Sequence, residues 1–162
     1  GMYTMNFEDF VLEILDKKGE SAPSSLQRTF SNSKAISADV DAAYNPNYPS
    51  AFEKNNTAYL GKGVTLVKYS GVRGKSGSSE APAEFVAEIR KIYDSVGTKY
   101  QPCELGKVDK GGGGTIALTL ANRGMEVVDS GVPVMGMHSP FEITSKYDVY
   151  SAYKGYEAFY QS

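Results

Sequence analysis

Residues 80–105 read EAPAEFVAEIRKIYDSVGTKYQPCEL, a helix-forming segment followed at once by a strand-forming segment. The apolar side chains of the first part recur at helical spacing, at Phe85, Val86, Ile89, Ile92 and Tyr93. This spacing predicts a helix from Glu80 to Val96, which Gly97 ends because glycine readily adopts the left-handed conformation of a helix C-terminus. Tyr100 to Leu105 is then predicted to form a strand.

The same alternation of helices and strands continues along the rest of the chain. Further helices are predicted over Asn6 to Lys17, Ser21 to Ser31, Thr115 to Asn122 and Ser145 to Tyr160. Further strands are predicted over Lys34 to Val40, Val64 to Tyr69, Met125 to Asp129 and Val132 to Met137. This order predicts a layered α/β fold with a mixed, partly parallel sheet. With no internal repeat or linker, we expect a single domain over residues 1–162, in which Gly1 is a remnant of cloning.

Composition argues against several classes of protein. The net charge of −2 gives no electrostatic case for binding nucleic acid or an anionic membrane. No apolar run reaches the roughly 20 residues that a membrane-spanning helix needs. Cys103 is the only cysteine and cannot form an internal disulfide, so we expect a reducing, cytoplasmic location without a signal peptide.

Two aspartates stand near the end of the strand predicted over Lys34 to Val40. Asp39 and Asp41 lie two residues apart, so on a continuous strand both side chains would point into one cleft. Ligands of open α/β sheets bind beside the carboxyl ends of strands, which makes this pair a candidate binding site. From the spacing alone, the favoured interpretation is that one of the two carboxylates stabilises the following turn.

A glycine-rich segment, Gly111 to Gly114, precedes the helix predicted to begin at Thr115. Its backbone N–H groups could bind an anion such as a phosphate or a peptide carboxylate. The segment is not a P-loop and does not match the dinucleotide-binding fingerprint. A flexible loop is the simpler interpretation, and nothing else in the sequence supports a phosphate or nucleotide site.

His138 is the only histidine, and it follows the apolar strand predicted over Val132 to Met137. Imidazole is a preferred zinc ligand, and Glu142 lies four residues further on. A histidine after an apolar strand is more often a hydrogen-bonded structural residue. Asp39, the glycine segment and His138 all follow predicted strands, so one cleft could gather them.

Three motifs carry a resemblance to a known family. They are Ser37-Ala-Asp-Val-Asp-Ala-Ala-Tyr-Asn-Pro-Asn-Tyr48, Glu104-Leu-Gly-Lys-Val-Asp-Lys-Gly-Gly-Gly-Gly-Thr-Ile-Ala117 and Gly131-Val-Pro-Val-Met-Gly-Met-His-Ser-Pro-Phe-Glu142. In order and spacing they resemble the C-terminal half of the aspartyl aminopeptidase and aminopeptidase I family. The resemblance runs from about Phe7 to Tyr160 and is nearest to bacterial members, which share the pattern of the basic loop at Arg73 to Gly77.

The resemblance implies a three-layer α/β/α zinc-exopeptidase fold and a metallo-aminopeptidase that removes N-terminal residues from peptides. It implies two zinc ions, with Asp39 a ligand of one and His138 a ligand of the other. Gly113, Gly114 and Thr115 are implied to contact the peptide substrate, whereas Asp41 inherits no ligand role. Ala42 and Asn45 replace histidines of some eukaryotic relatives, which leaves a preference for acidic N-terminal residues without support.

The family also uses a further histidine, a bridging aspartate and a Glu-Glu pair that supplies the general base. The resemblance places these upstream of the segment present here. We therefore expect a truncated catalytic domain that is inactive alone, and that self-associates or requires the N-terminal half. The alternative is a non-catalytic α/β module that keeps the fold without the chemistry.

Overall fold

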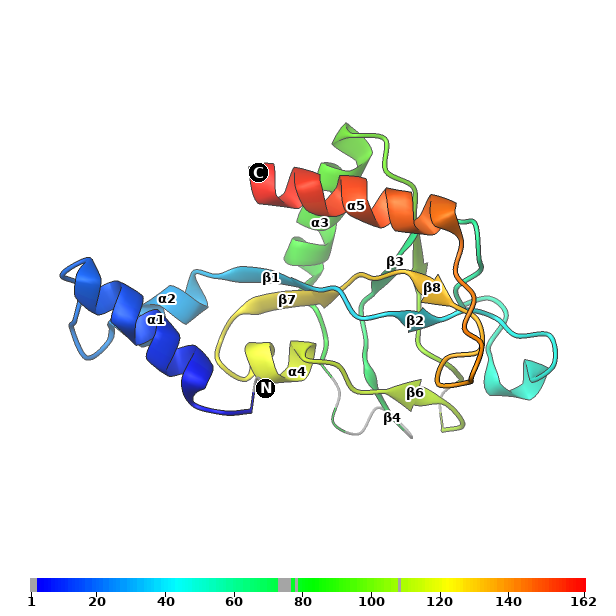
Figure 1. Ribbon diagram of the computed structural model, residues 1–162, viewed down its shortest axis with the longest axis horizontal. Coiled ribbons are helices and arrows are strands. Elements are labelled where there is room, and N and C mark those ends of the chain that lie inside the picture. The colour runs from blue at the N-terminus through cyan, green and yellow to red at the C-terminus, as the bar shows by residue number, and fades with distance from the viewer. Residues whose placement is uncertain (1–2, 73–76, 78, 108) are drawn as a thin grey trace.

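The computed structural model describes residues 3–72, 77, 79–107 and 109–162 (Figure 1). Its helices are α1 (Asn6–Lys17), α2 (Ser25–Ser31), α3 (Ala83–Ser95), α4 (Ala117–Ala121) and α5 (Lys146–Gln161), with a 3-10 turn at Pro49–Ala51. Its strands are β1 (Lys34–Ser37), β2 (Asp41–Ala42), β3 (Val64–Val67), β4 (Gly71–Val72), β5 (Tyr100–Cys103), β6 (Gly112–Gly113), β7 (Glu126–Asp129) and β8 (Pro133–Val134). Gly1 and most of the basic loop predicted at Arg73 to Gly77 lie outside the described residues.

The central sheet is mixed, as the sequence predicts. Its strand order is β1-β7-β3-β5. The pairs β1–β7 and β3–β5 are parallel, whereas β3 meets β7 in the antiparallel sense at Val67 and Asp129. The two halves of the sheet therefore run in opposite directions and meet beside Asp129.

Helices α3 and α5 cover one face of this sheet (Figure 1). Phe85, Ile89 and Tyr93 point inward from α3 and are at most 1% exposed. They pack with Val64 of β3 and Val128 of β7 in the main core cluster. Among the described residues, no helix is both long enough and apolar enough to cross a membrane.

The short helix α4 lies on the opposite face of the sheet. Ala117 and Leu120 of α4 pack against Val127, the neighbour of Val128 on β7. Successive strand residues point to opposite faces, so the adjacent valines serve two different helical layers. Phe7 of α1 adds to the α4 side. Helices on both faces confirm the predicted layered α/β architecture.

The strand predicted over Lys34 to Val40 is shorter than expected. Strand β1 ends at Ser37, and the chain leaves the central sheet before forming β2. Strand β2 pairs instead with β8 in a separate two-stranded sheet, with Asp41 opposite Pro133. The expectation of one continuous strand through Asp39 and Asp41 is therefore wrong, although both residues line the same small cavity.

A buried carboxylate connects α5 to the loop before β3. Asp148 is 0% exposed, and its two oxygens accept hydrogen bonds of 2.7 Å from the backbone N–H groups of Gly61 and Gly63. Gly63 has a φ of 99°, and a Cβ there would lie 2.1 Å from the carbonyl oxygen of Lys99. The Asp148 side chain therefore fixes a tight turn that leads directly into β3, one of the two inner strands of the central sheet.

Replacing Asp148 with alanine should lower the free energy of unfolding by about 2–4 kcal/mol, because two buried N–H groups lose their acceptor. Asp148→Asn keeps one acceptor oxygen and should cost less. Urea unfolding followed by circular dichroism measures both effects. Asp94→Ala, at an exposed position of α3, is the control and should change stability by no more than about 0.5 kcal/mol. Equal stability of Asp148→Ala and this control would contradict the prediction.

Candidate functional site

Asp39 lies just beyond the end of β1, with its side chain exposed. Its Oδ1 accepts a hydrogen bond of 2.9 Å from the backbone N–H of Val40. Gly131, which follows β7, touches the same residue, since a Cβ on Gly131 would lie 1.7 Å from the Asp39 carbonyl oxygen. Only glycine permits this approach, so the chain after β7 determines where the backbone of Asp39 lies.

Asp41 serves a different purpose from Asp39. It is only 3% exposed, and its carboxylate accepts hydrogen bonds from the Ala42 N–H at 2.8 Å and from the Cys103 thiol at 2.9 Å. Burial raises the pKa of the Cys103 thiol, and the negative charge of Asp41 raises it further. The thiol therefore stays protonated as a donor, and Asp41 joins β2 to the end of β5.

Asp129, the last residue of β7, was not singled out from the sequence. It is 7% exposed, and its Oδ2 accepts a hydrogen bond of 3.0 Å from the Thr115 hydroxyl. Its Oδ1 is buried without a hydrogen-bond partner among the described residues. Burial raises the pKa of Asp129 and the nearby Asp39 charge adds to this, whereas the hydrogen bond from the Thr115 hydroxyl acts in the opposite direction. The available signal was a carboxylate directly after the two apolar residues Val127 and Val128 of a predicted strand.

The glycine-rich segment is partly a strand rather than a loop. Gly112 and Gly113 form β6, paired with β4 in the antiparallel sense. Gly114 leaves this pair, is exposed, and has open space where a Cβ would stand. The Thr115 hydroxyl accepts a hydrogen bond of 3.1 Å from the Ala117 N–H, and α4 begins at Ala117 instead of Thr115.

Asp39, Gly114 and Thr115 line one open cavity of about 460 Å³, together with the side chains of Tyr3, Ile116 and Leu118. The helix that follows the glycines, α4, has only five residues. So short a helix contributes little dipole at its N-terminus, and the phosphate-binding alternative gains no support.

His138 lies in a turn instead of at the tip of a strand. Strand β8 ends at Val134, and Met135 then pairs with Ile143, so that the intervening residues form a hairpin. His138 is exposed in this hairpin with a φ of 66°, and its backbone N–H donates to the Glu142 carboxylate at 2.5 Å. Glu142 thus stabilises the turn that presents His138 to solvent.

The structure brings together only some of the predicted site residues. The cavities that Asp39 lines include Thr115 and Asp129 but not His138. Among the described residues, no group of three or more His, Cys, Asp and Glu side chains could hold a metal ion. Because a zinc site uses three or four protein ligands, the described residues do not make a complete zinc site by themselves.

Comparison with known proteins places these features in a family. The sequence model of the aminopeptidase I zinc metalloprotease (M18) family matches residues 3–160. A probable M18 family aminopeptidase 1 from Clostridium acetobutylicum is 48% identical over 159 residues, which cover 98% of this chain and 34% of the relative. The crystal structure of an M18 aminopeptidase from Thermotoga maritima superposes with a TM-score of 0.92 at 43% identity, covering 98% of this chain and 35% of that one.

A more distant solved structure is the S. cerevisiae mApe1 dodecamer. It has a TM-score of 0.70 at 24% identity and covers 93% of this chain and 32% of that chain, a likeness that shows the fold alone. The chain thus spans about a third of the length of the relatives it matches.

Gly131→Ala should lower the free energy of unfolding by about 2 kcal/mol or more, because the new Cβ cannot occupy the space of the Asp39 carbonyl. Gly114→Ala is the matched control, since its Cβ would meet nothing within 4 Å. Thermal unfolding of both variants tests this, and a loss of stability at Gly114 as large as that at Gly131 would count against it.

Asp129→Asn should stabilise the protein more at pH 7 than at pH 4. The raised pKa of Asp129 means that its protonated form is favoured in the folded state. Its contribution to stability is therefore complete below the unfolded pKa of about 3.9 and is lost as the pH rises through the folded value. Asparagine carries no charge at either pH and can still accept from Thr115.

Urea unfolding at both pH values measures this difference, with Asp94→Asn as the baseline for removing an exposed carboxylate. A stability change for Asp129→Asn that is the same at pH 4 and pH 7 would show that ionisation of Asp129 carries no cost.

Proposed function

Because the chain belongs to the aminopeptidase I zinc metalloprotease (M18) family, we propose that it carries part of the active site of a zinc aminopeptidase. Such an enzyme hydrolyses the first peptide bond of a peptide and releases its N-terminal residue. The observation that carries the proposal is the match over residues 3–160, which includes the Asp39, glycine and His138 motifs together. Residues 1–162 would then be one part of a larger catalytic domain.

In this proposal Asp39 and His138 are zinc ligands of the complete site. The Asp39 carboxylate is exposed, and Gly131 fixes the backbone that carries it. A metal ligand in an incomplete site needs both properties, because it has to be accessible and held in position. His138 is also exposed, and Glu142 holds its backbone in a left-handed turn. Zinc bound there supplies a Lewis acid that polarises a carbonyl and activates water.

The glycine-rich segment is proposed to bind the backbone of the peptide substrate. Gly114 and Thr115 border the same open cavity as Asp39, and Gly113 ends the strand that leads to it. Gly114 leaves the space above its Cα empty, so a substrate backbone can approach closely. Asp129 holds the Thr115 hydroxyl and thereby positions this end of the segment.

The remaining zinc ligands and the general base are proposed to come from polypeptide outside these 162 residues. The relatives are about three times as long as the segment they share with this chain. The absence of a complete ligand group among the described residues favours the same division. The chain by itself is then expected to be catalytically inactive.

The buried free thiol of Cys103 fits a reducing cytoplasmic location.

Self-association is a second proposed property. The S. cerevisiae mApe1 relative is a dodecamer. A non-catalytic module is the competing function, and the incomplete ligand group is the observation in its favour. The two functions differ in one measurable respect, since only the enzyme requires the carboxylate of Asp39 and the imidazole of His138.

The chain alone should show no hydrolysis of aminoacyl anilides above a His138→Ala control, with zinc, manganese or cobalt added. Supplying the part of the Clostridium acetobutylicum relative that lies outside the match, as a separate polypeptide, should restore zinc-dependent hydrolysis. In that mixture Asp39→Ala and His138→Ala should each lower kcat/KM by at least about 100-fold, since each removes a metal ligand.

Zinc content, measured by elemental analysis of the same mixtures, should fall in both variants and stay unchanged in Asp94→Ala. Metal-dependent turnover by the chain alone would overturn the proposed division of the active site. A mixture whose activity and zinc content do not depend on Asp39 and His138 would leave the non-catalytic module as the better description.

A further inference from the structure

A short hairpin carries His138 between β8 and α5, and hydrogen bonds hold its two ends (Figure 1). The backbones of Met135 and Ile143 exchange hydrogen bonds of 2.8 Å and 3.0 Å. The Thr144 hydroxyl donates to the Pro133 carbonyl at 2.9 Å, which ties the hairpin to β8. The loop between Met135 and Ile143 therefore starts and ends at fixed points.

The tip of this hairpin is tight and includes a residue in an uncommon backbone conformation. Gly136 has a φ of 76°, and a Cβ there would lie 2.9 Å from the Phe141 carbonyl oxygen. His138 has a φ of 66°, and among the described residues Asp109 is the only other non-glycine residue with a positive φ. The left-handed backbone is disfavoured for residues with a Cβ, so such a residue needs support from its surroundings.

The hydrogen bonds of the hairpin tip assign this support to Glu142. The Ser139 hydroxyl serves Phe141, donating to its carbonyl at 2.5 Å and accepting from its N–H at 3.3 Å. The Ser139 N–H donates to the Gly136 carbonyl at 2.9 Å. The His138 N–H donates instead to the Glu142 carboxylate at 2.5 Å. This bond joins His138 to a side chain four residues further on, so it restrains the φ of His138.

This contact changes the interpretation of His138 and Glu142 as a pair. A carboxylate four residues after an imidazole fits, by sequence alone, two ligands of one zinc ion. In the structure one oxygen of Glu142 is already bonded to the backbone of His138. Outer groups that orient a metal ligand typically change metal affinity by about 10–100-fold when they are removed. The geometry therefore fits Glu142 as the support of a ligand rather than as a ligand.

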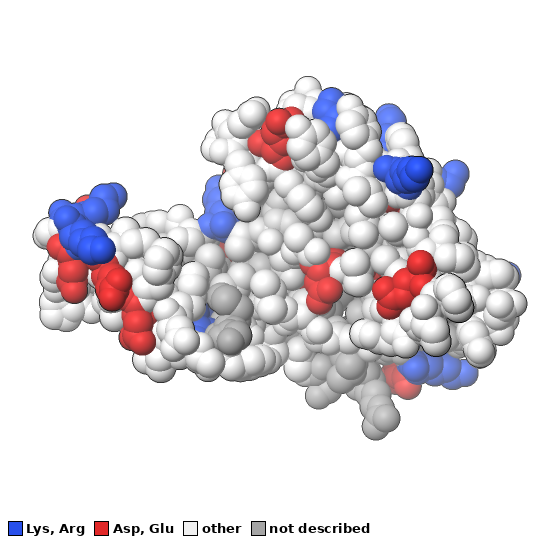
Figure 2. Space-filling view, viewed as in Figure 1, with Lys and Arg blue, Asp and Glu red and all other residues white. Residues whose placement is uncertain are grey.

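Charge alone gives Glu142 little hold over His138. Figure 2 shows the charged side chains on one face of the molecule in small, separate groups of both signs. Glu142 is exposed, and solvent and salt screen the field of an exposed carboxylate. Its hold on His138 therefore depends mainly on the hydrogen bond, which a neutral acceptor of the same shape also makes.

We propose that Glu142 is a positioning residue that acts through His138. Its carboxylate holds the His138 backbone in the left-handed conformation, and this conformation sets the direction in which the imidazole leaves the chain. Glu142 thereby places the imidazole where zinc and the remaining ligands can meet it. The role of the imidazole as a zinc ligand rests on the proposed function, whereas the hold on the His138 backbone rests on the hairpin itself.

The first test is hydrogen exchange in the chain alone. Glu142→Ala should speed exchange of the Met135 and Ile143 amides by at least about 10-fold, because the hairpin opens more often without this support. In a His138→Gly background the same substitution should change exchange by less than about 3-fold, since glycine adopts a positive φ without help. Glu142→Gln keeps an acceptor oxygen and should stay within about 3-fold of the unsubstituted chain.

The second test is zinc affinity, measured by competition with a chelating dye. It uses the chain mixed with the part of the Clostridium acetobutylicum relative that lies outside the match. Glu142→Ala should weaken zinc binding by about 10–100-fold, and Glu142→Gln by no more than about 3-fold. If Glu142 were itself a ligand, the glutamine variant would lose as much affinity as His138→Ala.

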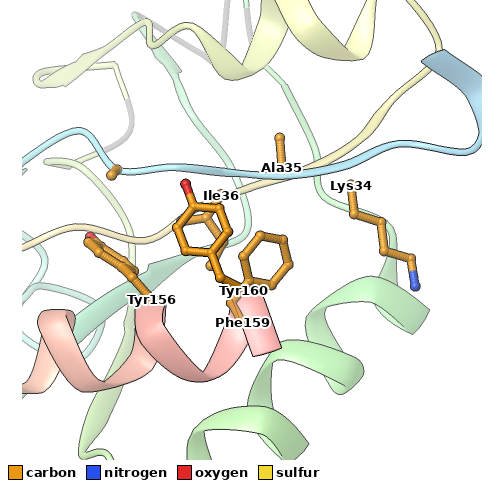
Figure 3. Close-up of a pocket in the computed structure, with 7 residues that line it drawn as sticks. Lys34, Ala35, Ile36, Tyr156, Phe159 and Tyr160 are labelled. Atoms are coloured by element: carbon orange, nitrogen blue, oxygen red, sulfur yellow. The ribbon is translucent and has the colours of Figure 1, made fainter. Parts of the chain in front are cut away.

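Glu88→Ala is the matched control. Glu88 is a partly exposed glutamate that also accepts a short hydrogen bond, of 2.6 Å from the Lys34 ammonium. Lys34 lines the pocket between β1 and the last turns of α5 (Figure 3), and none of the residues that line this pocket belongs to the hairpin. The control should leave both the exchange of the hairpin amides and the zinc affinity within about 2-fold.

Three outcomes would overturn the proposal. They are unchanged protection of the Met135 and Ile143 amides in Glu142→Ala, an equal change with and without His138→Gly, and a Glu142→Gln variant that loses as much zinc affinity as His138→Ala. A mixture whose zinc affinity does not depend on His138 would contradict the proposed function instead. The exchange data would then decide by themselves whether Glu142 holds the His138 backbone.

Discussion

Ser130 joins four segments in the interior of the protein, and the rest of the structure depends on this junction. Its N–H donates to the Ser37 carbonyl at 2.9 Å, and its hydroxyl lies 2.6 Å from the Thr65 carbonyl and 2.9 Å from the Tyr93 hydroxyl. Its own carbonyl accepts from the Tyr156 hydroxyl at 2.6 Å. One fully buried residue thus ties β7 to β1, β3, α3 and α5. Buried polar groups require such partners, so these elements hold only one mutual arrangement.

The junction also sets the position of the candidate site. Burial raises the pKa of Tyr93 to about 12 and also raises that of Tyr156, so both hydroxyls remain protonated around neutral pH. Gly131 is held by Thr65, with hydrogen bonds of 2.8 Å to the Gly131 carbonyl and 3.2 Å from its N–H. Asp129 and Gly131 flank Ser130 directly, and the first holds Thr115 while the second touches Asp39. The exposed carboxylate of Asp39 therefore rests on a rigid interior.

The sequence predicted correctly those elements that are determined by the spacing of neighbouring residues. Helix α1 has the predicted bounds Asn6–Lys17, because one apolar stripe determines it. The break of β1 after Ser37 was not predictable, since it depends on the contact between Asp39 and Gly131, which is distant in sequence. The pairing of Gly112 and Gly113 with β4 is likewise a tertiary effect, as is the hairpin that places His138 at a positive φ. The sequence motifs identified the candidate site residues, but not which of them share a cavity.

Folding and chemistry have different requirements in this chain. Both faces of the central sheet are covered by the chain's own helices, and most of the largest core cluster comes from β3, β7, α3 and α5. The junction at Ser130 needs no external group either. A zinc site, in contrast, needs at least three ligands converging within a few ångströms, and the described residues bring no such group together. In the proposed division of the active site, the interior around Ser130 holds Asp39 and Thr115 in place, and the remaining polypeptide would add ligands to that surface.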